Sequence, residues 1–374
     1  MKKYIYPTPE DWKELTERPH LDVTQLNATV AKVLNEVKTE GDNAVKKYEE
    51  MFDHVVLDSL AVSQTEMDEA ETLLPEALKK AIILAHHNIK VFHESQRFEG
   101  HHVETQPGVE CWQKSVAIER VGLYIPGGTA PLFSTVLMLA TPAQIAGCKE
   151  IVLCTPPAKD GRVNAAILFA AKVAGVNRIF KAGGVQAIGA MAYGTESVPK
   201  VYKIFGPGNQ YVMAAKQQVS LHDVAIDMPA GPSEVCVIAD HTAQPAFVAA
   251  DMDQAIELAN RYAPEHLIIQ AENYMELAER IVNAGSVFLG PYACESAGDY
   301  ASGTNHTLPT HGYATAYSGV NLDSFCRKIT FQHLTREGIR QIGWAVATMA
   351  DAESLTAHQR AMTIRMETIE KEQN

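Results

Sequence analysis

Arg120-Val121-Gly122-Leu123-Tyr124-Ile125-Pro126-Gly127-Gly128 is the stretch that decides the fold. An apolar strand is predicted over 116–125, and the Pro-Gly-Gly turn ends it. An apolar helix is predicted over 134–146, followed by a buried strand over 151–154 that two prolines terminate. A strand, a helix and a strand joined by short Gly/Pro turns predict a parallel sheet with helices on its faces.

The same alternation continues along the chain as far as residue 289. Further helices are predicted over 164–174, 186–193, 253–262 and 274–284, and further strands over 178–181, 201–205, 234–239, 266–270 and 286–289. The fold class is therefore α/β, with two parallel sheets that meet near 229–232.

Helical periodicity extends this core at both ends. Near the N-terminus it covers 23–52, where Gly41 breaks the pattern and Asp42 is expected to cap a second helix, and 66–92, which Pro75 divides. Near the C-terminus it covers 342–350 and 352–371.

Composition narrows the function classes. The 374 residues carry a formal net charge of −13, which argues against nucleic-acid binding because that needs a basic face. No apolar run approaches the roughly 20 residues of a membrane span, and no apolar segment follows Lys2 and Lys3 as it would in a signal peptide. The six cysteines include no C-x-x-C pair. We expect a cytoplasmic protein with reduced cysteines and no membrane anchor.

Three glycine-rich turns follow predicted strands, at 126–128, at 183–184 and at 206–208. None is a G-x-G-x-x-G fingerprint, and any single one is ordinary turn chemistry. Three at the carboxyl ends of parallel strands are also compatible with a phosphate or nucleotide site.

Two other segments gather acid–base groups. Pro264-Glu265-His266 places a carboxylate beside an imidazole at the start of a strand, a pairing used in proton transfer and also found in exposed loops. The run 295–306 holds Glu295, Asp299 and His306 in a predicted loop, where they could form a site or only cap the loop. On a single helix, Glu353 and His358 would point about 140° apart, as surface residues do.

Taken together, these motifs resemble the histidinol dehydrogenase family. The matching segments occur in the family's order and cover nearly the whole chain; they are 120–128, 181–188, 205–209, 230–235, 263–267, 295–306 and 355–358. The resemblance implies an NAD-dependent, zinc-containing homodimer that oxidises L-histidinol to L-histidine through histidinal.

The resemblance also implies roles for individual residues. Glu265 and His266 match the catalytic acid–base pair: His266 takes the alcohol proton, and Glu265 activates the water that hydrates the aldehyde. The positions that match NAD contacts are Tyr124, Gln186 and Asn209. The positions that match substrate contacts are Ser233, His266, Asp299, Glu353 and His358. Asp299 and His358 match zinc ligands, and Glu353 and His358 are expected to serve the partner's site.

The implied domains are two Rossmann-like parallel-sheet domains with helical extensions. The expected boundaries are an N-terminal extension at 1–22, a catalytic domain at 23–123 plus 232–320, an NAD-binding domain at 124–231 and a helical dimerisation tail at 321–374.

One part of the family pattern is absent. The other two zinc ligands of the family are a glutamine and a histidine in a Ser-Gln-Ala-Glu-His run after the position of Asp251, but here Asp251 passes directly to Met252-Asp253-Gln254. The chain is therefore expected to lack an internal block of the family's sequence, which carries these two ligands and at least one strand of the sheet. Gln254, Glu257 and His306 are the candidates to replace its ligands. Two alternatives stay open: a relative that oxidises another small alcohol, and a non-catalytic paralogue that binds nucleotide or a partner subunit.

Overall fold

The computed structural model describes residues 8, 10–18, 24–127, 131–228, 233–240 and 252–372. It divides into two compact units. The first unit is Met1–Gln96 with Ile118–Phe325, and the second is Arg97–Ala117 with Cys326–Asn374. No helix in the described ranges combines the length and apolar character that a membrane span requires.

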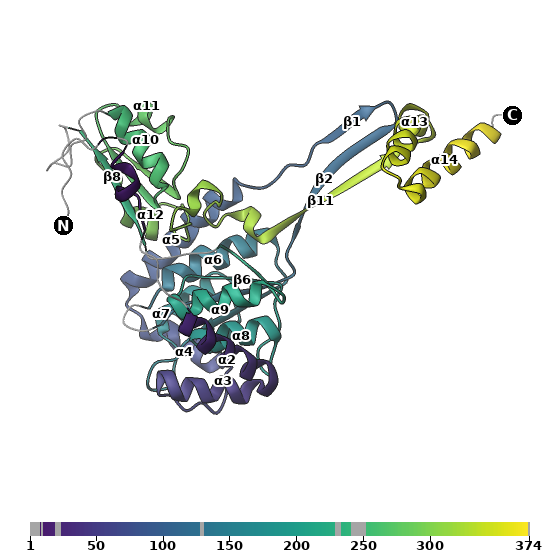
Figure 1. Cartoon of the computed structure of the whole chain (residues 1–374). Helices are drawn as coiled ribbons and strands as arrows, with labels where there is room; N and C mark the ends of the chain where they lie inside the picture. The colour runs from purple at the N-terminus through teal and green to yellow at the C-terminus, as the bar shows by residue number, and fades with distance from the viewer. Residues whose placement is uncertain are drawn as a thin grey trace. The chain divides into compact units, whose positions relative to one another are not determined.

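A five-stranded parallel sheet forms the centre of the first unit, in the order β5-β4-β3-β6-β7. Its strands are β3 (Arg120–Tyr124), β4 (Glu150–Thr155), β5 (Arg178–Lys181), β6 (Lys203–Phe205) and β7 (Ala225–Ile226). The helices between them are α6 (Phe133–Ala146), α7 (Ala165–Val173), α8 (Gly184–Tyr193) and α9 (Gln210–Ser220), of which α9 was not predicted. Figure 1 shows these helices against the sheet.

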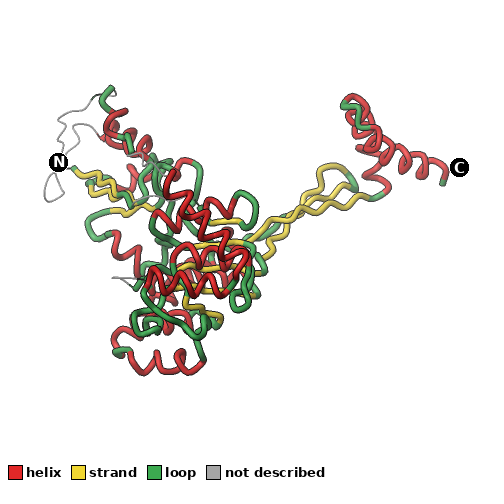
Figure 2. The backbone as a smooth tube through the Cα atoms, turned by 60° about the horizontal axis from the view of Figure 1, so that its bottom comes forward, coloured by secondary structure: helices red, strands yellow, loops and turns green. Residues whose placement is uncertain are grey.

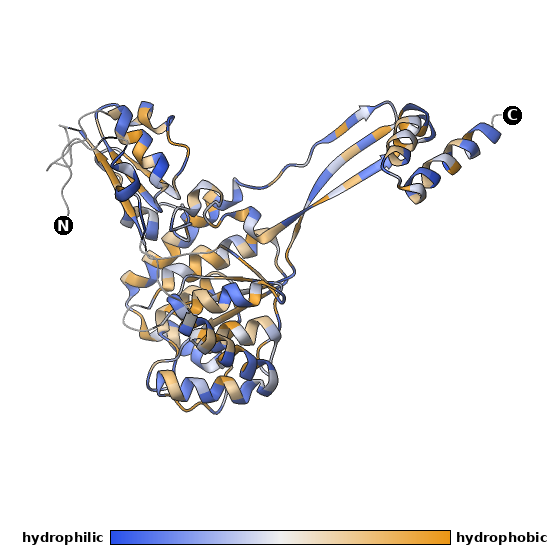
Figure 3. Cartoon of the chain, in the orientation of Figure 1, coloured by the Kyte–Doolittle hydropathy of each residue, from blue (hydrophilic) through white to orange (hydrophobic). Residues whose placement is uncertain are grey.

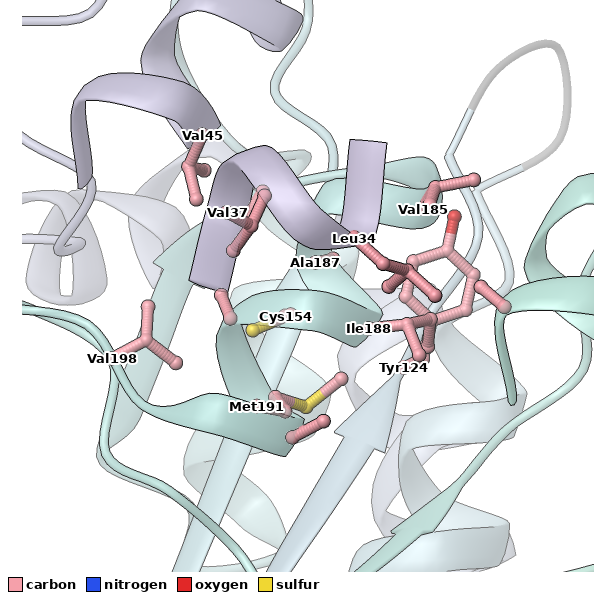
Figure 4. Packing of buried hydrophobic residues seen from close by; sticks show 14 of the residues in the cluster. Leu34, Val37, Val45, Tyr124, Cys154, Val185, Ala187, Ile188, Met191 and Val198 are labelled. Carbon is pink, nitrogen blue, oxygen red and sulfur yellow. The ribbon is translucent and has the colours of Figure 1, made fainter. Parts of the chain in front are cut away.

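The N-terminal segment supplies further helices, and all but the first of them pack onto the same sheet or its helices. They are α1 (Trp12–Leu15), α2 (Thr24–Glu40), α3 (Asp42–Tyr48), the π-helical turn η1 (Glu49–Asp53), α4 (Gln64–Leu73) and α5 (Glu76–Glu94). Helix α2 contacts α8 and α9, α4 contacts α7, and α5 contacts α6. In the core between α2 and α8, Leu34 lies near Ile188 and Tyr124, and Val37 and Met191 belong to the same buried cluster (Figure 4).

This packing differs from the expected domains. The boundary at 123/124 falls inside β3, and residues 24–53 pack with the five-stranded sheet because the apolar face of α2 is buried against α8. Gly41, with φ of 57°, is the cap of α3 rather than Asp42, whose carboxylate binds Thr195 and Ser197. The expected junction at 229–232 lies outside the described residues.

A second parallel sheet in the first unit has the order β10-β9-β8. Its elements are β8 (Val235–Ala239), α10 (Met252–Tyr262), β9 (His266–Gln270), α11 (Tyr274–Ala278), β10 (Ser286–Leu289) and α12 (Glu295–Tyr300), followed by the 3-10 turns η2 (Tyr313–Thr315) and η3 (Leu322–Phe325). Among the described residues β8 pairs only with β9, and its Val235 and Val237 are 55% and 42% exposed. An apolar edge strand of this kind is what the loss of a neighbouring strand would leave.

The second unit is a three-stranded antiparallel sheet followed by two helices (Figure 2). They are β1 (His102–Gln106), β2 (Val109–Ala117), β11 (Cys326–Leu334), α13 (Arg336–Ala352) and α14 (Thr356–Lys371). The tail at 321–374 was expected to be helical. Strand β11 corrects this: most residues of the sheet are exposed or half-buried, so the sequence lacks the alternation by which a half-buried strand is recognised.

Candidate active site

Glu265 and His266 lie where α10 turns into β9, the central strand of the second sheet. The turn passes through Ala263, a non-glycine residue at φ of 50°. The backbone amide of Ser286 then donates to the Glu265 carbonyl at 2.9 Å, and the amide of His266 donates to the Glu234 carbonyl at 3.2 Å. Both neighbouring strands therefore fix the backbone of the pair, and both side chains are buried.

The imidazole of His266 has one nitrogen engaged and one free. Nδ1 lies 3.2 Å from the carbonyl oxygen of Glu234, which can only accept, so Nδ1 carries the proton of that hydrogen bond. Nε2 is then the unprotonated nitrogen of the neutral ring. It is buried and has no hydrogen-bond partner. A buried, unpartnered lone pair is costly to maintain and is typical of a functional site.

Three carboxylates surround this ring. Glu265 Oε2 and Glu295 Oε1 each lie 3.7 Å from Nδ1, and Asp299 Oδ1 lies 3.8 Å from Nε2. Burial raises the pKa of Glu265, against the opposing effects of a hydrogen bond from the Glu234 amide and of the nearby His266. Glu295 and Asp299 are four residues apart on α12, so one face of that short helix presents both to the imidazole.

Arg18 supports the pair from a distant part of the chain. Its Nη2 donates to Glu234 Oε2 at 2.9 Å and to the Tyr262 carbonyl at 2.6 Å. The backbone amide of Glu234 in turn donates to Glu265 Oε2 at 3.0 Å. Arg18 thus holds the strand segment that holds both Glu265 and His266. No sequence pattern pointed to it, because Arg18 and Glu234 are 216 residues apart.

His306 lies next to this cluster. Its Nδ1 contacts the Asp299 carbonyl at 2.9 Å, and its Nε2 contacts Thr135 Oγ1 at 3.1 Å. Burial lowers the pKa of His306, which favours the neutral ring. Both ring nitrogens are therefore engaged in hydrogen bonds. Gln254 and Glu257 are exposed on α10.

The predicted zinc and substrate positions do not gather into one described cluster. Asp299 lies beside His266, and Ser233 is the residue before Glu234. Glu353 and His358 belong to the second unit, where both are exposed. They lie on different helices, since Glu353 caps α13 and Ser354 turns at φ of 60° before α14, so the single-helix angle expected from their spacing is wrong. Across the described residues, no three His, Cys, Asp or Glu side chains form a group that could hold a metal. These residues do not fit a complete zinc site, which needs at least three protein ligands.

The three predicted NAD positions all lie at carboxyl ends of strands in the five-stranded sheet. Tyr124 ends β3, and its hydroxyl accepts from the amide of Gly184 at 3.1 Å. Asn209 caps α9 after β6, accepting from the amides of Tyr211 and Val212. Gln186 lies in the first turn of α8 after β5.

These residues fit a dinucleotide. The Gln186 Oε1 atom is buried without a partner, which leaves an acceptor available beside the N-terminus of α8. Gly206, at φ of 134°, brings the turn after β6 so close to β3 that an added Cβ would lie 2.1 Å from the Tyr124 carbonyl oxygen. Such close glycine turns at a parallel-sheet edge are where nucleotides are bound.

Known proteins are similar to this chain over its whole length. A histidinol dehydrogenase from Bacteroides thetaiotaomicron is 57% identical to this chain, over 99% of this chain and 100% of the relative. A histidinol dehydrogenase from Escherichia coli is 44% identical, over 98% of this chain and 97% of the relative. The crystal structure of histidinol dehydrogenase from Elizabethkingia anophelis superimposes with a TM-score of 0.96 at 46% identity, covering 98% of both chains.

The same comparisons bear on the absent block. The alignment with the Bacteroides thetaiotaomicron relative spans 426 positions against 374 residues, so at least 52 of its positions (426 minus 374) have no residue here. The family model described as histidinol dehydrogenase matches in two segments, residues 16–253 and 250–366, which meet beside Asp251. Two matching segments that together span most of the chain leave one assignment: the chain belongs to the histidinol dehydrogenase family.

Proposed function

We propose that this oxidoreductase carries the chemistry of its family, the oxidation of L-histidinol to L-histidine in histidine biosynthesis, in two NAD-dependent steps. The observation that carries the proposal is the buried, unpartnered Nε2 of His266, facing a carboxylate of the predicted substrate site. No separate observation favours another small alcohol or a non-catalytic role.

In the first oxidation His266 Nε2 accepts the hydroxyl proton of the alcohol, while the C–H bond of the carbinol carbon breaks. The Nδ1 hydrogen bond to the Glu234 carbonyl fixes the tautomer that makes this possible and stabilises the imidazolium that forms. The carboxylates of Glu265 and Glu295, each 3.7 Å from Nδ1, add to that stabilisation.

In the second oxidation water must first add to the aldehyde. Glu265 takes one proton from that water as its oxygen bonds to the aldehyde carbon, and the resulting hydrate is oxidised to the acid. A carboxyl group whose pKa is raised by burial is a stronger base than an exposed one, which suits this role.

Tyr124, Gln186 and Asn209 would hold NAD at the carboxyl edge of the five-stranded sheet. Bound NAD supplies the acceptor for the two hydrides that the substrate loses. These residues align the turns after β3, β5 and β6. The Tyr124 hydroxyl accepts a hydrogen bond from the Gly184 amide, and Asn209 caps α9.

The substrate site would be completed by a second copy of the chain. Ser233 and Asp299 would contribute from one subunit, and Glu353 and His358 from the partner. Support for a homodimer comes from α13 and α14, where blue and orange residues are mixed in Figure 3 and Trp344 is 65% exposed. Exposed large apolar side chains on helices of a folded chain are typical of association surfaces.

Asp299 and His358 are the zinc ligands of the proposal, and the family's glutamine and histidine fall in the absent block. Two protein ligands are too few for a stable site, so no step above passes through the metal. We therefore propose that the chain as it stands is impaired and that the block, restored after Asp251, returns full activity.

The test is NADH formation from L-histidinol with added zinc, with the metal content measured on the same sample. The restored chain should form two NADH and one L-histidine per histidinol. A product of one NADH and free histidinal would contradict the two-step proposal, and turnover of another amino alcohol in preference to histidinol would contradict the substrate.

A further inference from the structure

The strand order of the five-stranded sheet shows where the cofactor's halves belong. The chain enters at β3, moves outward through β4 to β5, and then crosses back to β6 and β7 on the other side of β3. In sheets wound this way a dinucleotide lies across the point of reversal, here between β3 and β6. An acidic side chain about 20 residues past the first glycine turn, at the end of the second strand, binds the ribose of NAD in such folds.

The second strand of this sheet ends without such a carboxylate. Strand β4 runs into Thr155-Pro156-Pro157. Asp160 is the next acidic residue in the sequence. It is exposed in the following loop, and its Oδ1 accepts a hydrogen bond from the Arg162 amide at 3.0 Å. The cations at these strand ends are largely neutralised: Lys181 pairs with Glu66 at 2.7 Å and Arg162 with Glu69 at 3.2 Å, while Lys159 is exposed.

Two carboxylates from the π-helical turn η1 occupy this place instead. Glu49 Oε1 accepts from the Gly183 amide and from Gln186 Nε2, each at 2.7 Å. Asp53 Oδ2 lies 3.2 Å from the point where a Cβ on Gly183 would stand, and the Cβ of Pro156 lies 2.7 Å from the same point. Asp53 is therefore beside the end of β4, although it comes from about 100 residues earlier in the sequence.

The two carboxyl groups affect each other's ionisation. Burial, more than any other cause, raises the pKa of Glu49 to about 8, and the nearby carboxylate of Asp53 contributes to the rise. Glu49 Oε2 is buried without a hydrogen-bond partner. Burial also raises the pKa of Asp53, but Asp53 is only half-buried, so solvent stabilises a charge there better than at the fully buried Glu49.

We propose that Asp53, positioned by Glu49, binds the ribose hydroxyls of the cofactor's adenosine half and so selects NAD over NADP. The inference rests on the proposed use of NAD at this sheet. A carboxylate accepts hydrogen bonds from both hydroxyls of a ribose. A 2′-phosphate removes one of these donors and places a second negative charge against Asp53, so NADP is disfavoured twice.

Binding, measured without turnover, tests this. The whole chain and its Asp53→Asn variant are titrated with NAD and with NADP, followed by intrinsic fluorescence and by the rise in melting temperature. Asp53→Asn should weaken NAD binding by roughly 10-fold or more and leave NADP binding unchanged or tighter, because it removes charge-assisted hydrogen bonds to the ribose hydroxyls. Glu50→Gln, an exposed acid on the same turn, is the matched control and should change neither affinity.

Asp53→Ser, which removes the carboxylate entirely, should shift the NAD-to-NADP ratio in the same direction and guards against a folding defect in one variant. A ratio that stays constant in both variants, with NAD still bound, overturns the ribose assignment and leaves the use of NAD intact. Binding of neither nucleotide by the unmodified chain overturns both.

Discussion

A single hydrogen bond decides which nitrogen of His266 can act. With Nδ1 tied to the Glu234 carbonyl, Nε2 is the only ring atom free to take a proton. In a chain with the block restored, His266→Ala should slow histidinol oxidation by roughly 10²–10⁴-fold, the usual contribution of a general base, while NAD affinity stays near normal. His222→Ala, at an exposed imidazole, is the control. Equal losses of turnover and NAD affinity would point to misfolding and remove the assignment.

Glu49 makes stability depend on pH in a defined direction. Its pKa rises on folding from 4.5 to about 8, so the folded chain holds this proton more tightly than the unfolded chain does. The contribution of Glu49 to the free energy of unfolding is therefore fully present below pH 4.5. It declines by on the order of a few kcal/mol as the pH rises towards 8.

Glu49→Gln should abolish that decline. Glutamine keeps an oxygen for the Gly183 amide, and it does not ionise. The variant should melt close to the unmodified chain at pH 5 and clearly above it at pH 9, as followed by circular dichroism. Glu50→Gln should track the unmodified chain at both values. A melting difference that is the same at pH 5 and pH 9 would show that Glu49 is ionised in the folded state.

At the scale of single residues, the sequence points to acid–base groups but not to the residues that hold them in place. The segments 264–266 and 295–306 each gather such groups locally, and the structure brings Glu265, His266 and Asp299 together, while the roles that the family resemblance implies for them stay predictions. Arg18 and Glu49 were not predictable. Their partners, Glu234 and Gly183, are 216 and 134 residues away, and only the folded sheets bring them into contact.

At the scale of elements, the turn after β6 lies very close to β3 at the carboxyl edge of the five-stranded sheet. An added methyl group at Gly206 tests how rigid this contact is. Gly206→Ala would combine an unfavourable φ of 134° with a Cβ 2.1 Å from the Tyr124 carbonyl oxygen. Gly147→Ala shares the positive φ, at 89°, but its Cβ meets nothing within 4 Å. We expect a loss of about 1 kcal/mol in the free energy of unfolding at Gly147 and about 3 kcal/mol or more at Gly206, measured by urea denaturation. Equal losses would show that β6 shifts freely away from β3.

Strands were predictable where they are buried on both faces. The apolar runs of β3, β4 and β9 stand out because helices cover both sides of a parallel sheet, and the structure confirms them. Strands β1 and β11 and most of β2 escaped prediction because their mostly exposed residues alternate only weakly. Strand β8 is intermediate: a strand was predicted over 234–239, and in the part of the chain that the structure describes its outer edge is uncovered.

At the scale of the whole molecule, the absent block links metal, stability and activity. Asp299 and His358 alone should hold zinc loosely, since losing even an outer-shell partner typically costs roughly 10–100-fold in affinity. After dialysis the chain should carry clearly less than one zinc per subunit and oxidise little histidinol. Inserting a family-like block after Asp251, with its glutamine and histidine, should restore both together.

The same insertion should raise the melting temperature, because a strand beside β8 would cover Val235 and Val237, which now face solvent at a sheet edge. A block of equal length in which the glutamine and histidine are replaced by alanine separates the two effects. It should raise the melting temperature without restoring zinc or turnover. Tightly bound, stoichiometric zinc with normal turnover in the unmodified chain would contradict this account. Gln254 and Glu257, exposed on α10, would then be the first candidates for the replacement ligands. His306 would come after them, because it would have to give up a hydrogen bond to Thr135 or to the Asp299 carbonyl before it could bind a metal.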